Sequence, residues 1–148
     1  MSNLLSRRSV LIGATISLLA TGAACAGFFG RGAPKDLDLS LVRSTDAGRY
    51  LAEIKPNGGK PSVGPMHSWT LSLKATDGSP VDGASVSIDG GMPQHGHGLP
   101  TSPAVTKALG NGRYLIEGMR FNMRGWWVLD LGIDGQNGSD SIRFNVVI

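Results

Sequence analysis

Apolar and polar side chains alternate along four separate stretches of this chain. Successive side chains of a pleated strand point to opposite faces, so a period of two predicts strands with one buried face. No stretch after the N-terminal segment shows the periodicity of an amphipathic helix. The side chains expected to face inward are Trp69, Leu71, Leu73 and Ala75; Ala84, Val86 and Ile88; Trp127, Leu129, Leu131 and Ile133; and Ile142, Phe144, Val146 and Ile148.

Turn signals separate these stretches at short intervals. The segments PNGGKP, TDGSPVDG, LGNG and DGQNGSD are rich in residues that favour tight turns. A chain of 148 residues with 22 glycines and 17% charged residues suits one domain of short elements. We therefore predict an all-β fold, a two-sheet β-sandwich of seven to eight strands. The expected strands span 37–43, 48–55, 66–75, 84–89, 104–108, 113–119, 126–134 and 140–148.

The first 26 residues are typical of an export signal. Arg7 and Arg8 precede a long apolar run that ends in small residues, and the following letters SVLI resemble a twin-arginine signal. Two readings of Cys25 stay open. GAAC resembles a lipoprotein cleavage box with Cys25 lipidated, whereas ACA is an ordinary cleavage site. We expect an exported protein, periplasmic or lipid-anchored at the cell envelope, with its membrane contact limited to that anchor.

The domain boundaries follow from this assignment. We predict an export signal over 1–26, a glycine-rich linker over 27–36 and the β-sandwich domain over 37–148. Cys25 is the only cysteine, so the domain holds no disulfide and no thiolate ligand. Without Arg7 and Arg8, 12 basic residues face 11 acidic ones and are scattered along the sequence, which argues against a nucleic-acid partner.

The segment GGMPQHGHGLPTSP is the candidate functional site. His95 and His97 flank Gly96, and side chains two residues apart in an extended segment point the same way, so both imidazoles can reach one ion. Met92 lies three residues upstream of His95. Imidazole and thioether ligands without thiolate favour copper, as Cu(I) or Cu(II), over zinc.

Three further residues are candidate ligands, with core packing as the alternative for each. His67 follows a methionine but also shares the parity of Trp69, whose side chain is expected to be buried. Met119 and Met123 share a parity that could equally fill the core. The adjacent Trp126 and Trp127 point to opposite sides, so one should enter the core while the other shields a site or faces a partner.

Three segments resemble a known family: GPMHSWTLSL, DGSPVDGASVSIDGGMPQHGHGLPTSP and GNGRYLIEGMRFNMRGWWVLDLGI. They closely resemble the YtkA-like domain family, which is related to FixH-like proteins, and the similarity covers about 65–133. The resemblance implies an exported or membrane-anchored immunoglobulin-like sandwich with a role in periplasmic copper delivery or respiratory oxidase assembly. The positions that match the family's motifs are His67, Met92, His95, His97, Met119 and Met123.

Two functions remain in competition. The first is an exported copper-binding protein that holds or delivers copper, with a respiratory-complex assembly partner. The second is an interaction module of a membrane-associated complex, in which the histidine loop and the Trp126 region dock a partner without metal. We do not expect an enzyme, because no nucleophile elbow of the type G-x-S-x-G occurs in the sequence.

Overall fold

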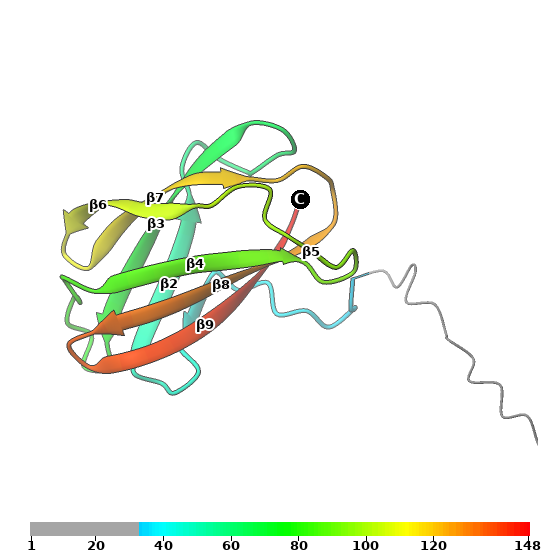
Figure 1. The fold of residues 1–148 in the computed structure, drawn as a ribbon. Coiled ribbons are helices and arrows are strands. Elements are labelled where there is room, and N and C mark those ends of the chain that lie inside the picture. Colours follow the sequence, from blue (N-terminus) through cyan, green and yellow to red (C-terminus); the bar gives the residue numbers. More distant parts are fainter. Residues whose placement is uncertain (1–32) are drawn as a thin grey trace, which may run out of the picture.

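Residues 33–148, the part of the chain that this computed structural model describes, form a sandwich of two β-sheets joined by turns and loops (Figure 1). All strand pairs are antiparallel. In spatial order the first sheet contains β1 (Val42–Ser44), β2 (Tyr50–Pro56), β3 (Met66–Ala75), β7 (Arg113–Arg120) and β6 (Ala104–Gly110). The second contains β5 (His97–Gly98), β4 (Ser85–Met92), β8 (Trp126–Gly135) and β9 (Gly138–Val147).

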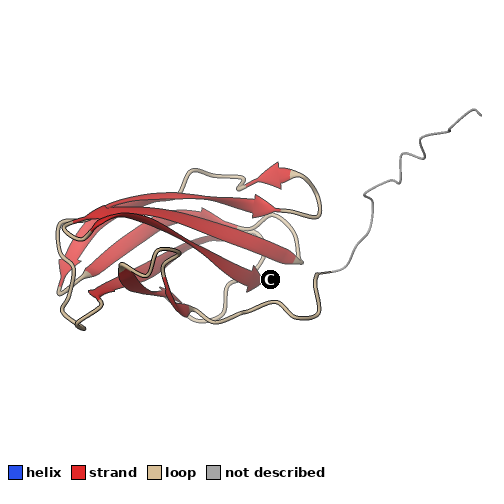
Figure 2. Cartoon of the chain, turned by 90° about the horizontal axis from the view of Figure 1, so that it is seen from below, coloured by secondary structure: helices blue, strands red, loops and turns tan. Residues whose placement is uncertain are grey.

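This architecture confirms the all-β sandwich expected from the sequence. The described residues include no helix, as Figure 2 shows, and hence none that could span a membrane. The predicted export signal over 1–26, with Cys25, lies outside the described residues, as does most of the linker over 27–36. Those assignments remain predictions.

The first strand is shorter than the alternation predicts. Pairing with β2 begins only at Leu41, whose carbonyl oxygen accepts a hydrogen bond from the Ile54 amide. The preceding residues instead form local bonds, because the Asp38 carboxylate accepts from the Ser40 amide and pairs with Arg43. Local side-chain bonds of this kind compete with strand pairing. The two-residue strand β5 was not predicted, because two residues carry no periodicity.

The core fills the space between the sheets with the side chains that the alternation predicted. The inward residues predicted for β3, β8 and β9 are buried except Ile148, which lies just beyond β9 and is partly buried. Ala84, Val86 and Ile88 are also partly buried and pack against the margin of the core. Burying one large apolar side chain contributes about 1.5–3 kcal/mol, so these layers dominate the stability. The largest fully buried side chains include Trp69, Trp127, Tyr50, Phe121 and Phe144.

The edge of the first sheet at β6 is irregular. Strand β6 shifts its register against β7 twice, between Val105 and Lys107 and again between Ala108 and Gly110. Nearly all of its side chains are exposed.

Two opposite ends of the sandwich differ in composition. At the first, β3 and β8 begin and β4 and β7 end, so the connections 57–65, 93–96, 99–103 and 121–125 lie together. We call it the His/Met end, and it includes β5 in Figure 1. The second end holds the connections 45–49, 76–84, 111–112 and 136–137. We call it the Asp end.

Candidate functional site

All three histidines of the chain, and every methionine that the structure describes, lie at the His/Met end. They reach it from the start of β3, the end of β4, the end of β7 and two connections. Met66 and Met92 are close to a histidine along the sequence, and the topology gathers the whole set in space. The residues are Met66, His67, Met92, His95, His97, Met119 and Met123.

A tight hairpin presents the two candidate histidine ligands. Residues 93–96 connect β4 to β5, and the backbone amides of His95 and Gly96 both donate to the Met92 carbonyl oxygen at 3.0 Å. Gly96 has a φ of +67°, a left-handed conformation that glycine adopts without strain. The chain therefore reverses within four residues and brings His97 back beside the end of β4.

Strand register places Met92 and His97 on the same face of this hairpin. The two residues are direct partners in the antiparallel β4–β5 pair, and the Cβ atoms of such partners lie about 4.5–5.5 Å apart. Met92 is 1% exposed and continues the inward face of Ile88. Its methyl carbon lies against Gly125, where an added Cβ would approach it to 2.9 Å. The Met92 side chain is thus held below the exposed His97 ring.

The two imidazoles of the hairpin lie side by side. The ring centroids of His95 and His97 are 5.8 Å apart with an interplanar angle of 27°, and both residues are exposed. Of the four imidazole nitrogens of His95 and His97, only His97 Nδ1 has a hydrogen-bond partner among the described residues, the Gly98 carbonyl oxygen at 3.3 Å. Both nitrogens of His95 and Nε2 of His97 are therefore open to a ligand.

His67 occupies a different position. Its Nε2 lies 2.8 Å from the Ser62 carbonyl oxygen, which ties the imidazole to the loop before β3. Its neighbour in register on β7 is Met119, which is buried at 1% exposure. The structure thus places His67 with Met119, in agreement with the packing alternative, and not with the hairpin.

A row of aromatic rings separates these two groups. Phe121 is 6.0 Å from His67 and 5.3 Å from Trp127 between ring centroids, and Trp127 is 6.1 Å from His97. Residues 33–148 contain no group of three His, Asp or Glu side chains arranged to hold a metal ion. A metal bound by both hairpin histidines therefore needs a thioether or a partner's donor as a further ligand.

Met123 is the one exposed thioether in the β7–β8 connection. Met123 is 37% exposed, and its carbonyl oxygen accepts a hydrogen bond from Trp127 Nε1 at 3.1 Å. Gly125 and Ile148 exchange two backbone hydrogen bonds of 3.1 Å, which anchor the same connection. The backbone of Met123 is therefore fixed beside Trp127, the ring that contacts His97.

The double tryptophan divides as predicted. Trp127 is fully buried in the core, whereas Trp126 is half-buried and donates from Nε1 to Asn145 Oδ1 at 3.0 Å. Alternation along the sequence did not indicate that Phe121 separates the two groups or that Gly125 makes room for Met92. A glycine directly before two tryptophans was the available signal for the latter.

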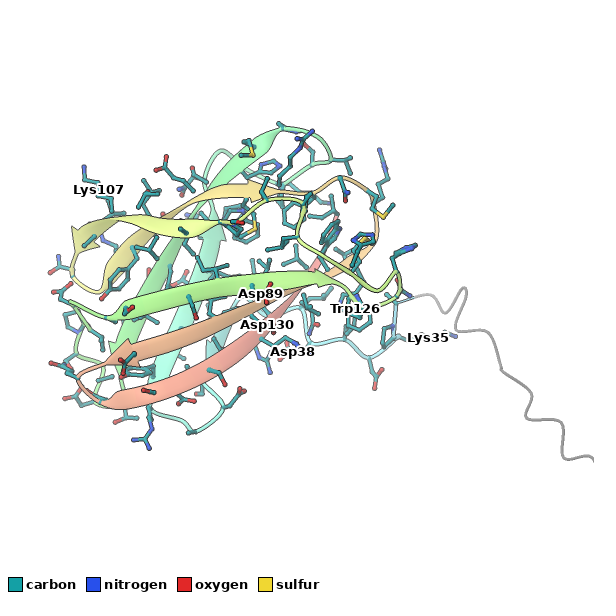
Figure 3. The ribbon with its side chains drawn as sticks, in the orientation of Figure 1. Lys35, Asp38, Asp89, Lys107, Trp126 and Asp130 are labelled. Carbon is teal, nitrogen blue, oxygen red and sulfur yellow. The ribbon has the colours of Figure 1, made fainter. Side chains whose placement is uncertain are left out.

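The nearest carboxylates of the second sheet lie on its outer face. Asp89 and Asp130 are direct partners across β4 and β8, and Figure 3 shows them together on this face. Asp89 has the opposite parity to Met92 along β4. Asp130 is ion-paired with Arg143 at 2.6 Å. A shallow groove along the hairpin is lined by both carboxylates and by His97.

Fold and site together define a small β-sandwich protein with a hairpin rich in histidine and methionine at one end. The sequence profile of the YtkA-like family matches residues 45–132, and the chain belongs to this family. The match includes the hairpin and the β7–β8 connection, and it confirms the resemblance to the family. The relationship to FixH-like proteins remains a prediction.

Comparison with solved structures supports the fold. The crystal structure of a DUF4426 family protein from Pseudomonas aeruginosa is similar, with a TM-score of 0.53 and 15% sequence identity. The similarity covers 72% of this chain and 94% of that protein. At this identity the likeness concerns the fold alone. No curated protein sequence gives a significant match.

Proposed function

We propose that this is an exported copper-binding protein that holds or delivers copper in the periplasm through the β4–β5 hairpin. The observation that carries the proposal is the shared face of Met92 and His97, with the His95 ring 5.8 Å from that of His97. Assembly of a respiratory oxidase is the use that we expect for the delivered ion, in line with the family resemblance.

The donor set fits copper better than the other common metals. Two imidazoles and a thioether suit copper, and thioether ligands favour Cu(I) in particular. Zinc sites use thiolate, imidazole and carboxylate, and calcium and magnesium need oxygen ligands. Asp89 and Asp130 share only a shallow groove with His97, and the described residues hold no group of three His, Asp or Glu side chains arranged around one ion, so these carboxylates do not supplement His95 and His97. We therefore expect Cu(I) to bind more tightly than Cu(II).

Exposure of the two histidines favours delivery as well as storage. Both rings are exposed, whereas Met92 is buried below them, so a partner's donor atom can approach the ion from the solvent side. Ligand exchange then proceeds without opening the fold. Among residues 33–148, Met123 is an exposed thioether whose carbonyl oxygen is bonded to Trp127, the ring beside His97, so it can act as an additional, exchangeable ligand.

Calorimetric titration of the metal-free protein with Cu(I) and Cu(II) tests this proposal. We expect one site, and a loss of affinity above about 100-fold in the double variant His95→Ala, His97→Ala, since even outer-shell partners are worth about 10- to 100-fold. Met92→Leu keeps the volume of the side chain and removes the sulfur, so it should weaken Cu(I) more than Cu(II). His67→Ala is the matched control and should leave both affinities unchanged. Undiminished binding by the double variant would refute the assignment.

The second candidate, a docking module without metal, is favoured by exposed apolar side chains at the same end. Met66 is 62% exposed, Val63 39% and Met123 37%. Affinity capture from the native membrane, with metal-stripped and copper-loaded protein compared, separates the two functions. A partner retained equally by both forms, together with no copper binding in the titration, would favour the docking module.

A further inference from the structure

Charge is distributed unequally between the ends of the sandwich. The connections at the His/Met end contain no Asp or Glu. Three exposed cations stand there, Lys60 in the β2–β3 connection, Arg120 at the end of β7 and Arg124 before β8. Within residues 33–148 none of the three forms an ion pair or a side-chain hydrogen bond. Their charges are therefore available to a partner.

The Asp end has the opposite character. Asp46, Asp77 and Asp82 lie in its connections and are exposed, and Asp134 and Asp140 flank the β8–β9 turn. Burial opposes ionisation of Asp140, but hydrogen bonds from Thr45, Ala47, Ser141 and Arg49 outweigh it and lower the pKa to about 2. Arg49 is the only cation in these connections, so they carry a net negative charge at neutral pH, opposite in sign to the connections of the His/Met end.

Backbone contacts join the three cationic positions to the hairpin. The Gly64 amide donates to the Phe121 carbonyl oxygen at 2.9 Å, which links the loop of Lys60 to the β7–β8 connection. That connection carries Arg124, and its Gly125 contacts Met92. Arg120 is the register partner of Met66. The cations and the exposed thioethers thus belong to the same end as the imidazole pair.

We infer that the His/Met end is a docking surface for an acidic protein surface, the one that receives the copper ion. The inference rests on the proposed function and extends it to the partner. Complementary charge raises association rates by about 10- to 1000-fold, and unpaired cations around an open metal loop provide it. Exposed Met66 and Met123 supply apolar contact beside this charge. The copper ion passes as Cu(I), with the partner's donors replacing the imidazoles and no change in oxidation state.

An acidic protein explains the placement better than an anionic membrane surface. Lipid headgroups offer negative charge but no nitrogen or sulfur ligand that could take copper from His95 and His97. An acidic acceptor protein offers negative charge together with nitrogen or sulfur ligands. Such a partner accounts for the presence of unpaired cations and open imidazoles at the same end of the molecule.

Transfer of Cu(I) to two synthetic acceptor peptides tests the inference. Both peptides carry the same Met- and His-containing copper site, flanked by Glu in one and by Lys in the other. We expect the copper-loaded protein to transfer to the Glu peptide at least about 10-fold faster at low ionic strength. The advantage should vanish near 0.5 M salt, where screening acts within a few ångströms.

Charge reversal locates the surface. The double variant Arg120→Glu, Arg124→Glu should prefer the Lys peptide, and Lys60→Glu alone should reduce the preference for the Glu peptide. Lys107→Glu is the matched control, because Lys107 is an exposed cation on β6, away from Trp126 in Figure 3. This variant should transfer copper like the unaltered protein. Circular dichroism confirms that each variant is folded.

The outcomes separate this inference from the function on which it rests. If copper binds and both peptides accept it equally fast at low salt, the docking inference is wrong and the copper function stands. If no copper binds, the proposed function fails, and equal affinity of the metal-free protein for both peptides would overturn the docking surface as well. Binding to phosphatidylglycerol vesicles through Arg120 and Arg124, without preference between the peptides, would assign the patch to the membrane instead.

Discussion

The two ends of the sandwich use their polar groups in different ways. At the Asp end, Asp140 accepts hydrogen bonds from Thr45 Oγ1 at 2.7 Å and from the amides of Ala47 and Arg49 at 2.9 and 3.1 Å. Tyr50 and Tyr114 donate from their hydroxyls to backbone carbonyls at 2.6 Å. These bonds tie the turns to one another and to the core.

At the His/Met end, many polar groups are left open instead. The His95 ring, Lys60 and Arg124 have no side-chain hydrogen bond among the described residues, and the exposed Met123 is held only through its backbone. Buried aromatic rings provide the rigidity of this end. The open imidazoles and cations thus lie at one end of the apolar core, whereas the carboxylate that accepts several hydrogen bonds lies at the other.

The largest effect should come from the aromatic partition beneath the His/Met end. Phe121 is fully buried and contacts the rings of His67, Trp69 and Trp127. Phe121→Ala should lower the free energy of unfolding by about 3–5 kcal/mol, as measured by urea denaturation. The exposed neighbour Asn122→Ala should change it by less than about 0.5 kcal/mol. A loss below about 1 kcal/mol for Phe121→Ala would show that these rings do not support the hairpin.

At the Asp end, Asp140→Asn should cost about 1–2 kcal/mol at pH 7, allowing for solvent screening. The carboxylate has a pKa of about 2 in the folded protein against an ordinary value of 3.8. Its contribution is therefore present above about pH 4 and is lost as the pH falls toward 2. Urea unfolding across this range should show that slope in the unaltered protein and a weaker one in the variant.

Glu53→Gln is the control for this experiment, because Glu53 is an exposed carboxylate without a hydrogen bond in the described part of the chain. It should leave both the stability at pH 7 and the slope unchanged. Copper affinity should remain unaltered in Asp140→Asn. A change there would contradict the separation of the two ends.

Gly125→Ala should lower the free energy of unfolding by an intermediate amount and should also weaken copper binding. Gly125 has a φ of +130°, where an L side chain is strained, and an added methyl would meet Met92. We expect a stability loss of about 1–3 kcal/mol and weaker Cu(I) binding. Gly58→Ala imposes similar backbone strain in open space, so it should reduce stability without changing copper affinity. Equal copper affinity of the two variants would exclude Met92 as a ligand.

The smallest change in stability should come from the double variant His95→Ala, His97→Ala. Both side chains are exposed, so the free energy of unfolding of the metal-free protein should change by less than about 0.5 kcal/mol. In the presence of copper, the unaltered protein should gain thermal stability and the variant should not. A loss above about 1 kcal/mol without metal would mean that the histidines serve the fold.

Local patterns predicted most of the fold because burial follows strand parity. The inward sets of β3, β8 and β9 could be assigned from alternation alone, and the loop of His95 and His97 from its glycines and proline. The separation of His67 from the two hairpin histidines could not be predicted from the sequence. It depends on Phe121, which lies between His67 and the hairpin once both sheets have assembled. Lys60, Arg120 and Arg124 appeared scattered along the sequence because they come from separate segments, which meet only when the two sheets assemble.

The double register shift of β6 has a consequence for the behaviour of the protein at high concentration. An outer strand with a regular ladder is a template on which a second chain can pair, and bulges and lysine side chains prevent such growth. The irregular backbone between Val105 and Gly110, with Lys107 at its centre, therefore protects this edge from aggregation. A second chain should therefore not extend the first sheet at β6.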